Sequence, residues 1–160
     1  MFGFGAAMTA VVGVSIGAGK VERAEQVGWT GSAFAAGLAG SIGLILAIFP
    51  DFWISAFTDD AATFAAARSY IQIVGPCFAF QGLGLSLYFA CQGAGAMFWP
   101  VVSLLLRAIL AVGGALILIN VTDWGLAGVF YAAGFGMVIY GIIMVSALKW
   151  GALRRGQSTP

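Results

Sequence analysis

Residues 26–50 read QVGWTGSAFAAGLAGSIGLILAIFP and contain no Asp, Glu, Lys or Arg. An α-helix rises about 1.5 Å per residue, so about 20 apolar residues cross a hydrocarbon core about 30 Å thick. The stretch is long enough to cross a membrane. It lacks the alternation of polar and apolar residues that marks the strands of a membrane barrel. It therefore predicts a transmembrane helix.

Charge-free runs cover most of the remaining chain: 1–19, 69–106, 108–122 and 124–148. The run 69–106 is long enough for two helices, with a break at Gly93-Ala94-Gly95 and a restart at Pro100. We predict an all-α, polytopic transmembrane helix bundle, with residues 1–150 as the membrane domain and 151–160 as a cytoplasmic tail. The five predicted spans are 1–19, 28–49, 69–92, 99–119 and 125–148.

Composition excludes several classes of protein. Of the 160 residues, 61% are hydrophobic and 8% charged, whereas an average soluble domain has about 25% charged residues. A net charge of +1 without a basic patch argues against a nucleic-acid partner. Two cysteines and no histidine exclude a disulfide scaffold and histidine-based chemistry. We expect no metal and no cofactor, and the lipid bilayer as the main partner.

The basic residues predict the orientation of the spans. Alternating spans place Lys20, Arg23, Lys149, Arg154 and Arg155 on one side. The other side receives Asp51, Asp59, Asp60, Asp123 and a single arginine, Arg68. The first side is therefore predicted to be cytoplasmic and to hold the C-terminus, in the plasma (inner) membrane. The tryptophans favour the same boundaries, because all of them fall at span ends: Trp29, Trp53, Trp99, Trp124 and Trp150.

Gly13-Val14-Ser15-Ile16-Gly17 matches the GxSxG pattern of serine hydrolases. That pattern requires a strand-to-helix turn and a base, usually histidine, and this chain offers a helix and no histidine. We therefore expect no enzymatic activity here. The glycine spacing instead predicts close helix packing, since small residues let helices approach in lipid. Gly37/Gly40 and Gly134/Gly136 form similar groups.

The third predicted span carries a polar stripe. At about 100° per residue, four side chains fall within about 40° of the direction of Tyr70: Cys77, Gln81, Tyr88 and Gln92. Pro76 should kink this helix, because proline cannot donate to the carbonyl of Gln72. A polar stripe in an apolar span is typical of a helix that lines a pathway, but hydrogen bonding between packed helices also produces one.

Arg107 is the only formal charge deep inside a predicted span. It lies about 12 Å from Trp99 along the helix axis, where an arginine costs about 2.5 kcal/mol or more. One interpretation is a long side chain that reaches back to the headgroups. The other is a charge in a cavity or gate, which would meet Gln92 or Ser103.

Four segments resemble a known family when taken in order. Val12-Gly13-Val14-Ser15-Ile16-Gly17-Ala18-Gly19 resembles a VGQxxGAG stretch, and Ala56-Phe57-Thr58-Asp59-Asp60 an FTxD segment. Gln92-Gly93-Ala94-Gly95 resembles an RGxGD helix end, and Trp124-Gly125-Leu126-Ala127-Gly128 a GLxGxW helix start. Together they are similar to the multidrug and toxic compound extrusion (MATE) family of secondary transporters.

The resemblance implies twelve helices in two lobes, of which this chain would be a C-terminal fragment covering part of the second lobe. It implies export of small organic cations in exchange for sodium ions or protons. One branch of the family has an ion-binding acid where this chain has Gln81, and the arginine and aspartate of the helix-end motif are Gln92 and Ala96 here. Coupling would then depend on the missing N-terminal lobe.

We therefore expect a secondary active efflux transporter, an antiporter of drugs and organic cations. Its pathway candidates are Tyr70, Gln81, Tyr88 and Gln92, with Arg107 in gating or support. The alternative is a small membrane protein that does not transport, either a split or degraded gene product or an assembly subunit.

Overall fold

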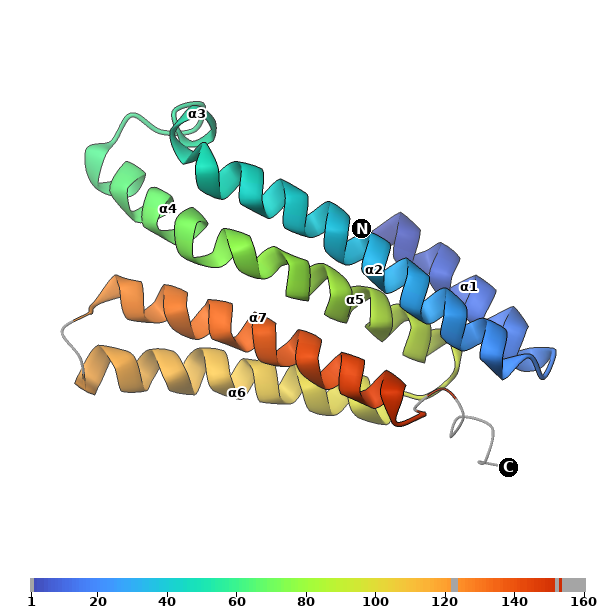
Figure 1. Cartoon of the computed structure of the whole chain (residues 1–160). Helices are drawn as coiled ribbons and strands as arrows, with labels where there is room; N and C mark the ends of the chain where they lie inside the picture. The colour runs from blue at the N-terminus through green and yellow to red at the C-terminus, as the bar shows by residue number, and fades with distance from the viewer. Residues whose placement is uncertain (1, 122–123, 152, 154–160) are drawn as a thin grey trace.

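The computed structural model describes residues 2–121, 124–151 and 153. Its elements are helical throughout, and the described residues contain no strand (Figure 1). The expected all-α bundle is confirmed. In chain order the elements are α1 (Phe2–Gly17), α2 (Val21–Ile48), α3 (Pro50–Ile54), α4 (Ala61–Val74), the 3₁₀ turn η1 (Gly75–Cys77), α5 (Phe78–Gly93), α6 (Phe98–Val121) and α7 (Leu126–Lys149).

Four helical segments are long and apolar enough to cross a membrane: Val21–Ile48, Ala61–Gly93, Phe98–Val121 and Leu126–Lys149. Helix α1 is also apolar, but its 16 residues extend only about 24 Å. Helix α2 begins at Val21, so only residues 18–20 separate it from α1. The chain is therefore a multi-pass membrane protein.

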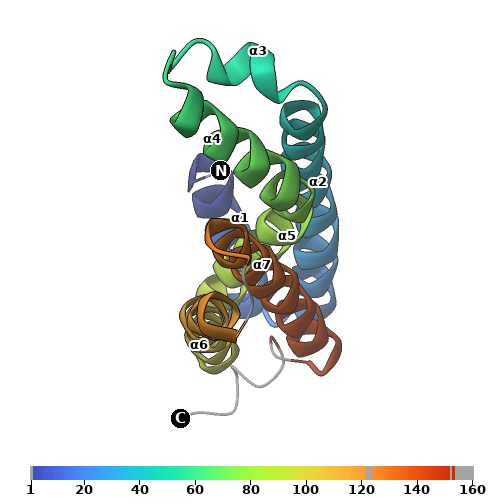
Figure 2. The ribbon, with the colours of Figure 1, turned by 90° about the vertical axis from the view of Figure 1, so that its left-hand side faces the viewer.

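Helix α5 lies at the centre of the bundle. It packs against α1, α2 and α7, whereas α6 lies at the edge and packs mainly on α7. Figure 2, which looks along the bundle, shows α5 enclosed by these three neighbours. Helix α5 is therefore covered by three neighbouring helices, whereas most of α6 is exposed in this structure.

Tryptophans and a lysine gather at one end of the bundle. The ring centroids of Trp99 and Trp150 lie 5.9 Å apart. Trp29 and Lys149 line, together with Trp150, a hollow of about 370 Å³. The fold thus brings together residues that the alternation of spans assigned to one side. That this side is cytoplasmic stays a prediction.

The opposite end carries exposed carboxylates and Arg68. The Nε atom of Arg68 lies 3.4 Å from Oδ1 of Asp51, and both side chains are about half exposed. Such a pair contributes about 0–1 kcal/mol, but it explains how one arginine is accommodated on the acidic side. Three charges used to assign the sides, Asp123, Arg154 and Arg155, lie outside the described residues.

Two helices end in the same Gly-Ala-Gly motif. Gly19 and Gly95 have φ of 70° and 71°, the left-handed region that favours glycine. After α1, the amide of Lys20 donates to Ser15 O and that of Gly19 to Ile16 O. After α5, Ala96 and Gly95 donate to Cys91 O and Gln92 O in the same pattern. Both ends are Schellman motifs, which satisfy carbonyls that the helix leaves free.

Helix α4 begins with a side-chain cap. Asp60 is the N-cap. Its Oδ2 atom accepts hydrogen bonds from the amide and the hydroxyl of Thr63, at 2.8 and 2.7 Å. The carboxylate therefore satisfies one of the amides that the first turn of a helix leaves free.

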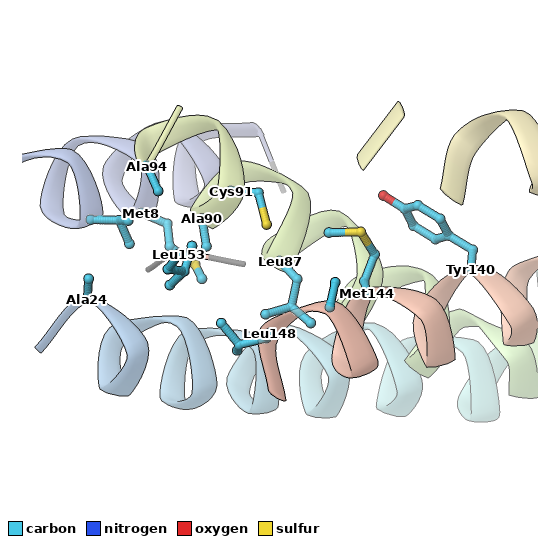
Figure 3. Packing of buried hydrophobic residues seen from close by; sticks show 12 residues of the cluster. Met8, Ala24, Leu87, Ala90, Cys91, Ala94, Tyr140, Met144, Leu148 and Leu153 are labelled. Atoms are coloured by element: carbon cyan, nitrogen blue, oxygen red, sulfur yellow. The ribbon is translucent and has the colours of Figure 1, made fainter. Parts of the chain in front are cut away.

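The main core cluster lies among α1, α2, α5 and α7 (Figure 3). Its members are Met8, Val12, Ala24, Leu87, Ala90, Cys91, Ala94, Tyr140, Met144, Ala147, Leu148 and Leu153. Leu153 belongs to the segment predicted as a tail, yet it is fully buried here. The rest of that segment, 154–160, lies outside the described residues.

Candidate functional site

Two residues of the polar stripe contact α7. The rings of Tyr70 and Phe130 meet edge to face, with centroids 5.2 Å apart. Cys77 lies against Gly134, where an added Cβ would come 3.2 Å from its Sγ atom. This part of the stripe is therefore an interface with α7 in this structure.

The stripe is not one continuous helix face. The break expected at Pro76 takes the form of η1, which contains Cys77 and separates Tyr70 on α4 from Gln81, Tyr88 and Gln92 on α5. A groove of about 450 Å³ opens beside η1 and is lined by Gln72, Ile73, Cys77, Tyr131, Gly134, Phe135 and Val138. Tyr70 and Gln92 lie about 33 Å apart along the segment. The candidate residues are therefore spread along the bundle and do not form one compact site.

Gln81 and Tyr88 lie on the part of α5 inside the bundle. Gln81 is partly buried, and its Oε1 atom has no hydrogen-bond partner. Tyr88 is partly buried and packs against the core cluster, with its ring edge to face with Phe89. Gln92, in contrast, is exposed at the end of α5. Gln81 is therefore the stripe residue with an unmet polar group inside the bundle.

Tyr140 on α7 completes this region, and the sequence analysis missed it. Its side chain is 1% exposed and its hydroxyl has no hydrogen-bond partner. Figure 3 shows its ring beside Met144, at one edge of the core. The ring packs on Gly84 of α5, where an added Cβ would overlap it. Gln81 lies three residues before Gly84, one turn along the same helix.

Arg107 reaches the same tyrosine from α6. The backbone and stem of Arg107 lie against Gly136, with Cγ 3.6 Å from the position of an added Cβ. Its guanidinium carbon lies 5.5 Å from the ring centroid of Tyr140. Gly136 and Tyr140 are four residues apart on α7. The stem of Arg107 therefore contacts one turn of α7, and its guanidinium lies over the ring on the next turn. We call Gly84, Arg107, Gly136 and Tyr140 the Tyr140 cluster.

The partner of Arg107 is thus an aromatic ring. Ser103, one partner considered, donates instead to Pro100 O at 2.9 Å and to Met144 Sδ at 3.3 Å. In the described part of the chain no carboxylate forms an ion pair with Arg107. A desolvated cation–π contact contributes about 2 kcal/mol, which roughly offsets the lower bound of about 2.5 kcal/mol for arginine in a span.

The carboxylates of the residues that the structure describes lie at helix ends, in the short helix α3 and in loops. Glu22 and Glu25 are in the first turns of α2, and Asp51 is in α3. Among the described residues, no group of three His, Cys, Asp or Glu side chains could hold a metal ion. The local chemistry is therefore aromatic faces, neutral oxygens and one guanidinium.

Comparison with protein families decides the identity. The family model described as MatE matches residues 1–117, which is most of the chain. The chain belongs to the MatE family. The matched part runs from α1 into α6 and includes Gln81, Tyr88 and Arg107, while Tyr140 lies beyond it.

MatE proteins are transporters, so this chain is a multi-pass membrane protein of a transporter family. A search of curated proteins finds no match. A search of solved structures finds none either. The roles of Tyr70, Gln81, Tyr88, Gln92 and Arg107 therefore stay predictions.

Proposed function

We propose that this MatE chain forms the C-terminal part of a secondary active antiporter that exports small organic cations. The observation that supports this most is a pair of buried oxygens without partners, Gln81 Oε1 and Tyr140 Oη. Each such orphan group costs about 1–3 kcal/mol in a folded protein. Groups kept at that cost inside a transporter are candidates to bind water or substrate during transport.

The chemistry of the region favours a cation as cargo. The aromatic face of Tyr140 and the neutral oxygens attract positive charge. An organic cation carries its charge on a bulky apolar body, which suits the apolar walls supplied by Leu87 and Met144 of the core cluster. Gln81, Tyr88 and Tyr140 would then lie along its path, with Tyr70 and Gln92 towards the two ends.

The driving force would be a sodium or proton gradient. Gln81 cannot take up a proton as a carboxylate does, so the coupling site is proposed to lie on the N-terminal lobe that joins this chain. Transport would follow alternating access, in which the two lobes rock about a central site. The protein would reside in the plasma (inner) membrane with its C-terminus in the cytoplasm.

A first test is the DNA upstream of the Met1 codon. Under this proposal it encodes about seven further spans, in the same frame or an adjacent one. A promoter and a stop codon directly upstream would instead favour the alternative of a small membrane protein that does not transport.

The second test is an export assay on the assembled transporter, in cells that lack other drug pumps. We expect Gln81→Leu to slow ethidium export at least about tenfold, the factor that corresponds to 1.4 kcal/mol, because the substitution removes the amide from the path. The matched control is Gln26→Leu, since Gln26 is exposed near the start of α2. Export unchanged by Gln81→Leu, at equal membrane expression, would contradict the pathway assignment.

A further inference from the structure

The Tyr140 cluster holds a positive charge in an unusual way. Arg107 is partly buried, and its guanidinium lies 5.5 Å from the centroid of the Tyr140 ring. Among the described residues, no carboxylate forms an ion pair with it. A guanidinium held mainly by an aromatic face can leave that face without separating an ion pair.

The ring itself is built into the bundle. Gly84 of α5 packs directly against the Tyr140 ring, and Tyr140 is 1% exposed. The stem of Arg107 lies against α7 at Gly136, with Cγ 3.6 Å from the position of an added Cβ. Because these contacts fix the ring, the aromatic face stays in place whether or not the guanidinium covers it.

The surroundings would also suit a different cation. An aromatic face presents the negative part of its quadrupole to whatever lies over it. The hydroxyl of Tyr140 has no hydrogen-bond partner. The aromatic face of this side chain attracts cations, and the guanidinium of Arg107 lies over it in this structure.

We propose that Arg107 is a tethered cation that fills a site for a small quaternary ammonium or guanidinium-type ion on the face of Tyr140. A free cation binds there only when the guanidinium swings away, so Arg107 and cargo exclude each other. This inference deepens the proposed function. Its test measures cation binding to the chain alone and involves no transport. A failure of the inferred cation site can therefore be distinguished from a failure of the proposed export function.

The test uses the purified 160-residue chain in lipid nanodiscs, with thermal unfolding as the readout. Arg107→Ala should unfold at a lower temperature than the wild type. Tetramethylammonium should raise that temperature in a dose-dependent way, with an affinity at least about tenfold higher than for the wild type. Two controls should not raise the unfolding temperature: sodium chloride at equal ionic strength, and tert-butanol, a neutral molecule of similar shape. The matched control Arg68→Ala, which removes an exposed arginine, should respond like the wild type.

A second substitution shows where the cation binds. In Arg107→Ala/Tyr140→Leu the effect of tetramethylammonium should disappear, because the aromatic face is gone. If Arg107→Ala does not fold, Arg107→Met keeps the volume of the stem and carries the same expectation. The proposal is overturned if neither Arg107 variant responds, if the wild type responds equally, or if the response survives Tyr140→Leu.

Discussion

At the scale of single residues, Gly43 shows how closely the helices approach in this bundle. It lies on α2 where that helix crosses η1, and an added Cβ would overlap the carbonyl oxygen of Gly75. The Cβ of Phe78 would be 2.9 Å away. In lipid, such backbone contacts replace the hydrophobic effect as the source of helix association.

We expect Gly43→Ala to lower the free energy of unfolding by about 1–3 kcal/mol, the usual cost of overpacking. Gly37→Ala on the same helix is the matched control, since nothing lies within 4 Å of its added Cβ. It should be neutral, or stabilising by up to about 1 kcal/mol through helix propensity. Unfolding in detergent micelles, followed by circular dichroism, measures both. Equal stability of the two variants would rule out a packing role for Gly43.

The same glycines show what spacing does not reveal. Gly13 and Gly40 face neighbouring helices: a Cβ added to Gly13 would lie 3.2 Å from Gly93 O, and one added to Gly40 would lie 2.9 Å from Ala79 Cβ. A Cβ added to Gly17 or Gly37, their predicted partners, would have nothing within 4 Å. A pair of glycines indicates that a helix has a small-residue face, but which member touches a neighbour depends on the crossing point.

At the scale of elements, the start of α4 depends on one carboxylate. The hydroxyl of Thr63, and then its amide, hold the pKa of Asp60 below its ordinary value of 3.8. A depressed pKa means that the folded state favours the charged form. The stabilisation is therefore complete above the unfolded pKa and is lost as the pH falls through the lower, folded value.

We expect Asp60→Ala to lower the melting temperature at pH 7, because it removes the cap from α4. The matched control Asp59→Ala changes the neighbouring exposed carboxylate and should have less effect. The gap between Asp60→Ala and the wild type should narrow below about pH 4, as the wild-type carboxyl protonates. Melting curves from pH 7 down to pH 3 test this, and a gap independent of pH would show that the carboxylate charge does not matter.

The segment Ala61–Gly93 shows which features a helical wheel predicts and which it does not. The stripe of Tyr70, Gln81 and Tyr88 follows from spacing, and the break at Pro76 follows from its missing amide. The wheel could not show that α7 packs against Tyr70 and Cys77, since α7 begins only at Leu126, far along the chain from these residues. It also gave no reason to select Tyr140, which is one tyrosine in an apolar span until Gly84 and Arg107 surround it.

At the scale of the whole molecule, the bundle has two chemically different ends. Lys149 and the paired rings of Trp99 and Trp150 mark one end. The ion pair of Arg68 with Asp51 marks the other. Basic residues are retained on the cytoplasmic side of membrane proteins, which predicts the orientation of the whole chain.

Cysteine labelling in intact cells tests that orientation. In a Cys77→Ser/Cys91→Ser background, Asp59→Cys should react with a membrane-impermeant maleimide from outside. Lys20→Cys, also exposed, should react only after the membrane is permeabilised. Labelling of Lys20→Cys in intact cells, with Asp59→Cys protected, would reverse the predicted topology.

By itself, the sequence determined the class of protein, the helical stretches, the sides on which charges gather and the singular position of Arg107. These follow from local rules, because the lengths of apolar runs and the cost of charge in lipid do not depend on neighbouring helices. The tertiary structure alone decided that α5 lies at the centre and that Tyr140 receives Arg107. Those contacts join α5, α6 and α7 through side-chain packing at helix crossings, and no local pattern in the chain encodes where helices cross.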